Sequence, residues 1–195
     1  MRSTIDRLIS WTGLVLAAVL LVAGGLLTWA SSFASSSVHD QLSMQQITMP
    51  AGDALATPDM KKYLSQYAGQ PMTTGAQAKA YADHYILGHM NEASGGKSYA
   101  EVSTEAMAAA KSAPTAQATI DLQNLKATLF QGNALRSMLL TAYAFGTLGA
   151  IAMYASIAAY VGAVLMLVLG LLGLRHARQS VVSVATPAAA TPVAV

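Results

Sequence analysis

Three histidines and one carboxylate are the residues of this chain best suited by type to hold a metal ion. His84, His89 and Glu92 are close in sequence, and His39 lies further upstream. Two histidines and one carboxylate on one face bind non-haem iron and leave positions open for oxygen and substrate. Helical residues five apart point about 140° away from each other, so His84 and His89 diverge unless Gly88 breaks the helix. The spacing favours packing roles for the histidines, with a site on His89, Glu92 and His39 left open.

Five methionines share this segment with the histidines, and thioether with imidazole ligation suits Cu(I). These methionines are Met44, Met49, Met60, Met72 and Met90. Their spacing is irregular, and methionine mostly serves as adaptable filler of apolar cores. We therefore expect no metal and no cofactor.

The chain also lacks the patterns of covalent and phosphoryl-transfer enzymes. It has no cysteine, and it contains no G-x-S-x-G, Walker or H-E-x-x-H motif. The pair Gly95 and Gly96 is typical of a helix stop rather than of a phosphate cradle. We predict that the protein is not an enzyme.

Aromatic side chains at helical spacing are better candidates for binding than for catalysis. Tyr81, Tyr85 and His89 follow one another at intervals of four residues, so they share one helix face. We expect this face to contact a partner protein. In the alternative, Tyr63 and Tyr67 join Tyr81 and Tyr85 around a pocket for a small molecule or metal.

The composition places these residues in a membrane protein. Of 195 residues, 54% are hydrophobic and 10% are charged, against about a quarter charged in soluble domains. The net charge of +2 is scattered along the chain, which excludes a nucleic-acid surface with its clustered basic face.

The first apolar run, residues 8–30, is long enough to cross about 30 Å of hydrocarbon as a helix. Trp11 and Trp29 bracket it at the depth of the two interfaces, and Arg7 precedes it. A cleavable signal peptide is the alternative, with a small-x-small site at residues 32–34, but the apolar run is longer than such peptides use.

The second charge-free run, residues 137–174, is longer than one span needs. We predict a transmembrane helix over residues 152–174, with residues 136–151 as an amphipathic approach helix continuous with it. A hairpin of two spans is rejected because the run has no polar turn residues. Tyr154, Arg175 and Arg178 would anchor this span at the interfaces.

Basic residues near the span ends set the orientation. Residues 1–7 and 175–195 are predicted to be cytoplasmic, the latter as a disordered tail of Ala, Pro, Thr and Val. Residues 31–135 form the extracytoplasmic domain, because the segment between the spans carries no excess of basic side chains. The serines at positions 31, 32 and 35–37 are predicted to form a polar hinge where the chain leaves the membrane.

Local signals predict about four short helices in this domain. Thr57 and Pro58 begin one that stops at Gly69, and Thr74 begins one that stops at Gly95. Ser98 and Glu101 form a capping box for a third helix through position 110. A fourth begins at position 114, and its continuation past position 132 into the second span is left open.

Small residues four apart allow close approach of the helices, chiefly between the two spans. The residues assigned to this packing are Gly13, Ala17, Gly146, Ala150, Ala155, Ala158, Ala159 and Gly162.

Four blocks of the sequence resemble a family of small actinobacterial membrane proteins that has no established activity. They are TIDRLISWTGLVLAAVLLVAGGLLTWASSF, VHDQL, YAGQPMTTGAQAKAYADHYI and LTAYAFGTLGAIA. The resemblance implies two spans with an outward helical loop. Some members carry the label of aromatic ring-opening dioxygenase, which the histidine spacing does not support.

Together these observations predict an all-α protein with two transmembrane helices and an extracytoplasmic bundle of about four short helices. Its predicted function is that of a non-enzymatic anchor, scaffold or accessory subunit in the plasma membrane of the cell envelope. Its partners would be the lipid bilayer and either another protein or a second copy of itself. The alternative is a receptor that binds a small molecule or metal in the loop.

Overall fold

The computed structural model describes residues 2–182, and within that range the chain is helical and contains no strand. The α-helices are α1 (Arg2–Met44), α2 (Pro58–Leu64), α3 (Gly75–Ala80), α4 (Leu87–Ser94), α5 (Tyr99–Ser112) and α6 (Gln117–Val182). Short 3-10 turns occupy Gly52–Ala54 and Ser65–Tyr67, and a π-helix, η3, occupies Tyr81–Ile86. The predicted all-helical class is confirmed, and the predicted tail from position 183 onward lies outside the described residues.

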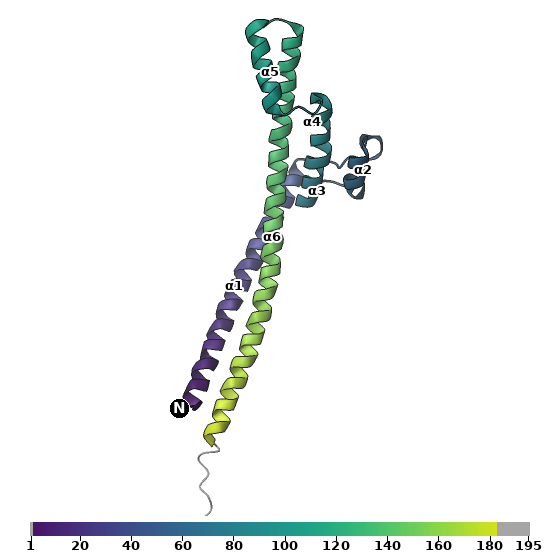
Figure 1. Cartoon of the computed structure of the whole chain (residues 1–195). Helices are drawn as coiled ribbons and strands as arrows, with labels where there is room; N and C mark the ends of the chain where they lie inside the picture. The colour runs from purple at the N-terminus through teal and green to yellow at the C-terminus, as the bar shows by residue number, and fades with distance from the viewer. Residues whose placement is uncertain (1, 183–195) are drawn as a thin grey trace, which may run out of the picture. The chain divides into compact units, whose positions relative to one another are not determined.

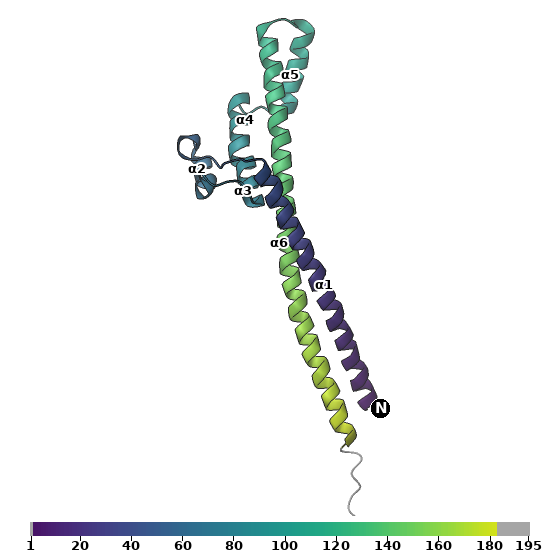
Figure 2. The same cartoon turned by 180° about the vertical axis from the view of Figure 1, so that it is seen from behind.

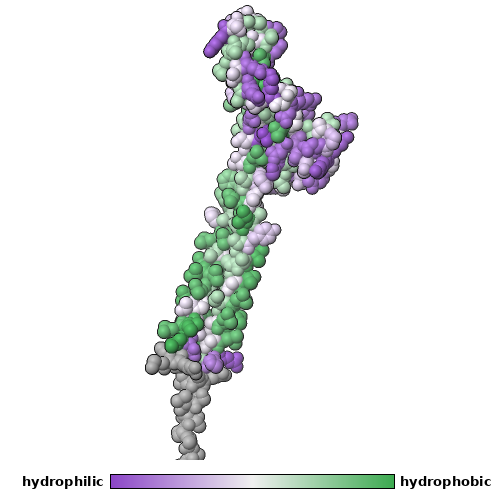
Figure 3. Space-filling view, viewed as in Figure 1, coloured by the Kyte–Doolittle hydropathy of each residue, from purple (hydrophilic) through white to green (hydrophobic). Residues whose placement is uncertain are grey.

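Two of the helices, α1 and α6, are long and apolar enough to cross a membrane. The chain divides into two compact units, and both long helices contribute to each. The first unit, called here the helix pair, holds the chain up to position 31 and from position 150 onward. The second unit, called here the helical domain, holds residues 32–149. Figure 3 shows apolar side chains over the surface of the helix pair and polar ones over α2–α4.

The helix pair is antiparallel and is held by small residues. Gly13 lies against Gly170, whose Cα is 3.8 Å from the position a Cβ would take on Gly13, and Leu20 lies against Gly162. Buried positions recur every seven residues along both helices. They are Ser10, Ala17, Gly24 and Ser31 on α1, and Ser156, Ala163, Gly170 and Ala177 on α6. A seven-residue repeat of small side chains lets two helices pack closely along their whole contact.

In the helical domain, α2–α4 lie on one side of α6, and α5 lies beside the first turns of α6 on the other side (Figures 1 and 2). Its main core joins α1, α2, α3 and α6, and includes Leu42, Met60, Leu64, Ala78 and Leu139. A smaller core under α5 holds Met90, Val102 and Leu129. The aliphatic core is thus shared between local helices and the two long ones, which α2 and α3 could not bury alone.

Local signals place most helix ends where the sequence predicts them. Thr57 accepts a hydrogen bond from the Met60 amide, and Pro58 occupies the first turn of α2. Thr74 with Gln77, and Ser98 with Glu101, form capping boxes. Gly95 ends α4 in the left-handed conformation at φ 61°.

Two expectations about the elements need correction, and a third is confirmed. The serines at 31, 32 and 35–37 do not form a hinge, because α1 continues unbroken to Met44; its buried Val38 and Leu42 hold that end in the core. The predicted second helix is interrupted by η3. The continuation of the fourth helix past position 132 is confirmed, since α6 begins at Gln117 and continues through the second apolar run.

Candidate functional site

The π-helix η3 gathers most of the polar and aromatic side chains of the helical domain. Its wide turn is closed by the Leu87 amide donating to the Ala82 carbonyl, five residues back. Such turns are rare and occur often at functional sites. Here the wide turn directs neighbouring side chains to three different sides of the helix.

On the side facing α6, Asp83 contacts two positively charged side chains. It pairs with Lys79 one turn earlier and, across the domain, accepts a hydrogen bond from Arg136 Nη2 at 3.2 Å. Arg136 Nε also donates to the Ala82 carbonyl at 3.0 Å. Burial acts to raise the pKa of Asp83, but the hydrogen bonds and charges of Lys79 and Arg136 outweigh it, so this pKa lies below its ordinary value. The cluster fastens η3 to α6.

On the side facing α2, His84 forms a second contact. Its Nδ1 lies 2.7 Å from Asp59 Oδ2, and its ring stacks on Tyr63 with centroids 3.9 Å apart. Asp59 also lies in the first turn of α2, where an acid favours the helix dipole. His84 therefore joins α2 to η3.

The third side carries Tyr81, Tyr85 and His89 as one continuous aromatic column. The tyrosine rings stack at 4.9 Å, and His89 meets Tyr85 edge-on at 4.5 Å. Burial, with a smaller effect of neighbouring Tyr85, raises the pKa of Tyr81. His89 Nδ1 lies 3.7 Å from Glu92 Oε2. Both tyrosines pack against the main core, so the column stiffens the helix and exposes mainly His89.

This arrangement separates the residues considered for metal binding. His84 and His89 belong to different contacts, and residues 5–178 contain no group of three His, Cys, Asp or Glu side chains able to hold a metal ion. Four of the five methionines, Met49, Met60, Met72 and Met90, are buried in the two cores. They pack as apolar filler. Tyr67 also packs against the main core, and Tyr63 is occupied by His84.

The small residues assigned to helix packing fall into different environments. Gly13 and Ala17 face α6, and Gly162 faces Leu20 of α1. Ala155 and Ala159 are half-buried, whereas Ala150 and Ala158 are exposed. Gly146 lies in the helical domain, and a Cβ at this position would be 3.7 Å from the Gly75 Cα. The fully buried positions of the helix pair therefore follow the seven-residue repeat, and the four-residue pair Gly13 and Ala17 also lies on the contact face.

The residues assigned as interface anchors all have exposed side chains. They are Arg7, Trp11, Trp29, Tyr154, Arg175 and Arg178. Each lies on the helix pair, as does the apolar surface between them.

Two features escaped the sequence analysis. One is the role of Arg136: it is an isolated arginine within a long helix, and no local sequence pattern indicates that Asp83 is its partner. The other feature is an apolar strip on α6, called here the α6 face, formed by Phe130, Met138, Phe145 and Leu148. All four are more than half exposed, and on a helix they lie within about 80° of one another. Its helical spacing could have revealed it.

Comparison with protein-family models, curated proteins and solved structures found no match for this chain. The class of protein is therefore defined by its own fold: a helical chain with two helices long and apolar enough to cross a membrane.

Proposed function

We propose that this protein is a two-span plasma-membrane protein whose helical domain lies outside the cytoplasm and acts as an anchor, scaffold or accessory subunit. The contact would be made by the α6 face, through an apolar helical segment of a partner protein. The resemblance to actinobacterial membrane proteins agrees with this topology and stays a prediction.

The observation that carries the proposal is the contrast between the two sides of α6 in the helical domain. On one side, the side chains that could do chemistry are engaged in fastening helices together, as Asp83 is with Arg136 and His84 with Asp59. On the α6 face, large apolar side chains stay exposed. An exposed apolar strip on a polar domain is typical of a protein contact, and its helical spacing suits a helix partner.

The receptor alternative has less support. Tyr67, Tyr81 and Tyr85 pack against the core, and Tyr63 stacks on His84, so these rings fill the space that a ligand would need.

The experiment is a mild-detergent purification of the tagged full chain, with mass spectrometry of bound proteins and light scattering for self-association. Met138→Glu places a charge in the α6 face, and Thr128→Glu places one on another exposed side of the same helix. We expect a stoichiometric partner, or a dimer, that Met138→Glu removes and Thr128→Glu retains. A monomer without a partner, or equal loss in both variants, would refute the α6 face as a contact surface.

A further inference from the structure

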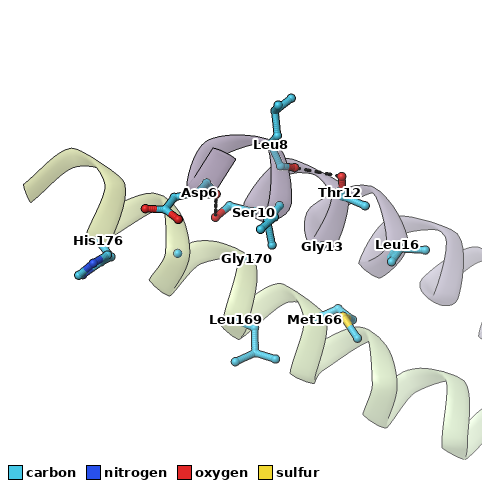
Figure 4. Close-up of a pocket in the computed structure, with 12 residues that line it drawn as sticks. Asp6, Leu8, Ser10, Thr12, Gly13, Leu16, Met166, Leu169, Gly170 and His176 are labelled. Atoms are coloured by element: carbon cyan, nitrogen blue, oxygen red, sulfur yellow. Dashed lines mark hydrogen bonds between the residues drawn. The ribbon is translucent and has the colours of Figure 1, made fainter. Parts of the chain in front are cut away.

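A groove of about 540 Å³ runs between α1 and α6 in the helix pair (Figure 4). It extends from Asp6 and His176 at one end to Leu16 and Met166 at the other. Along α1 this is a length of about 15 Å. The groove has the narrow, extended form that a hydrocarbon chain would fill.

The floor of the groove is made by glycines, and this explains why it exists. Gly13, Gly170 and Gly173 line it. A Cβ on Gly170 would lie 3.1 Å from the Ser10 carbonyl oxygen, and one on Gly13 would lie 3.6 Å from the Met166 carbonyl oxygen, so the two backbones come close together here. Close approach leaves a furrow beside the contact, because glycine carries no side chain to fill it.

The walls are apolar and the polar groups are gathered at one end. Leu8, Ile9 and Leu169 are exposed and line the sides. The hydroxyls of Ser10 and Thr12 donate to backbone carbonyls of their own helix, at 2.7 and 3.0 Å. Asp6 and His176 therefore supply the polar end of the groove.

Asp6 gives this end its specificity. It is the first acidic residue of the sequence, and none follows Asp121. Arg7 is next to it on α1, and Arg175 and Arg178 lie on the last turns of α6. Those arginines alone would attract any anionic lipid. A carboxylate lining the groove adds a partner for a cation, so the site suits a zwitterion that carries both charges.

We propose that the groove binds a phospholipid with a primary-amine head group, from the leaflet on the side of the chain termini. One acyl chain lies along Leu8, Leu16 and Leu169, the ammonium group donates to the Asp6 carboxylate, and His176 donates to the phosphate. The inference rests on the membrane insertion in the proposed function, but not on a protein partner.

The test is native mass spectrometry of the full chain, reconstituted in an equal mixture of phosphatidylethanolamine and phosphatidylglycerol and released in mild detergent. We expect one retained lipid, enriched about threefold or more in phosphatidylethanolamine, as one partly exposed ion pair would give. Asp6→Asn should abolish the enrichment and keep lipid retention, because the apolar walls remain.

Two tryptophan variants separate the groove from the general lipid surface. Leu169→Trp fills the groove and should abolish retention. Leu172→Trp, on the same helix, also replaces an exposed leucine outside the groove lining, and should behave like the wild type. Met138→Glu should leave retention unchanged, so the partner proposal can fail separately.

Wild-type protein without phosphatidylethanolamine enrichment, unchanged enrichment in Asp6→Asn, or equal lipid loss in the two tryptophan variants would each overturn the proposal.

Discussion

Gly24 shows how much a single missing side chain contributes to the helix pair. A Cβ at this position would lie 2.7 Å from Tyr160 Cε1, so the tyrosine ring occupies the space above the glycine. The Tyr160 hydroxyl also lies 3.1 Å from Thr28 Oγ1. Because that Thr28 hydroxyl donates to the Gly24 carbonyl at 2.9 Å, Tyr160 is the donor in the contact with Thr28. Ring and hydroxyl together fix one register of the helices.

We expect Gly24→Ala to lower the free energy of unfolding by about 1–3 kcal/mol, since overpacking displaces the Tyr160 ring. The melting temperature in detergent should fall by about 2–10 °C. Gly25→Ala is the matched control, because nothing lies within 4 Å of its would-be Cβ. An equal change in both variants would show that helix propensity, and not the tyrosine contact, governs this site.

Asp83 makes the stability of the helical domain sensitive to acid. Its pKa is lowered in the folded state, so its contribution is fully present above the ordinary value of 3.8 and is lost as pH falls through the folded value. Asp83→Asn should cost about 1–2 kcal/mol at pH 7, a figure reduced for partial exposure. The free energy of unfolding of this variant should also fall less steeply as the pH is lowered into the acid range. Asp53→Asn, at an exposed carboxylate, should preserve the wild-type pH dependence; an unchanged pH dependence in Asp83→Asn would contradict this account.

At the scale of the element, the seven-residue repeat predicts which substitutions separate the helices. Ala17 is buried in the contact and its neighbour Ala18 is exposed. Ala17→Leu should therefore destabilise the helix pair by about 1–3 kcal/mol, measured as thermal unfolding by the fluorescence of Trp11 and Trp29. Ala18→Leu adds the same atoms to the outer surface and should be close to neutral. The reverse order would show that α1 presents another face to α6.

A contact between α3 and α6 provides a second pair of contrasting glycines. A Cβ on Gly75 would lie 2.9 Å from the Tyr143 Cα, whereas one on Gly146 would lie 3.7 Å from the Gly75 Cα, an ordinary distance. We expect Gly75→Ala to push α3 away from α6 and Gly146→Ala to be tolerated. Protease resistance of the helical domain would report the difference. Similar resistance in the two variants would mean that α3 moves freely to accept the methyl group.

The elements that the sequence predicts well are those set by adjacent residues. Thr74 with Gln77 and Ser98 with Glu101 mark helix starts because each cap needs only its own first turn. The π-helix could not be predicted in this way. Its extra residue is accommodated by distant partners, with Arg136 donating to the Ala82 carbonyl and Asp59 meeting His84. The predicted hinge at serines 31, 32 and 35–37 was wrong for the same reason, since the burial of Val38 and Leu42 outweighs the local polarity of the serines.

At the scale of the whole molecule, composition and hydrophobic runs suffice to predict two long apolar helices, because span length depends on the bilayer alone. Pairing is harder to predict. Alanine and glycine are abundant throughout this sequence, so four-residue pairs of small residues arise by chance. The repeat of seven becomes recognisable only when Ser10 and Ser156 are counted as small residues together with Ala17 and Ala163.

The absence of native cysteine allows a direct test of topology, since any introduced thiol is unique. Thr115, exposed between α5 and α6, and Ser183, which follows α6 in the sequence, are expected to lie on opposite sides of the membrane. With arginines near both outer span ends, the positive-inside tendency predicts that an impermeant maleimide labels Thr115→Cys on intact cells and Ser183→Cys only after permeabilisation. Retention of an N-terminal tag would show that the first helix stays attached. Labelling of Ser183→Cys on intact cells would instead place the C-terminal end of the chain outside. Loss of the tag would show that the first helix is removed, which would leave α6 as the anchor.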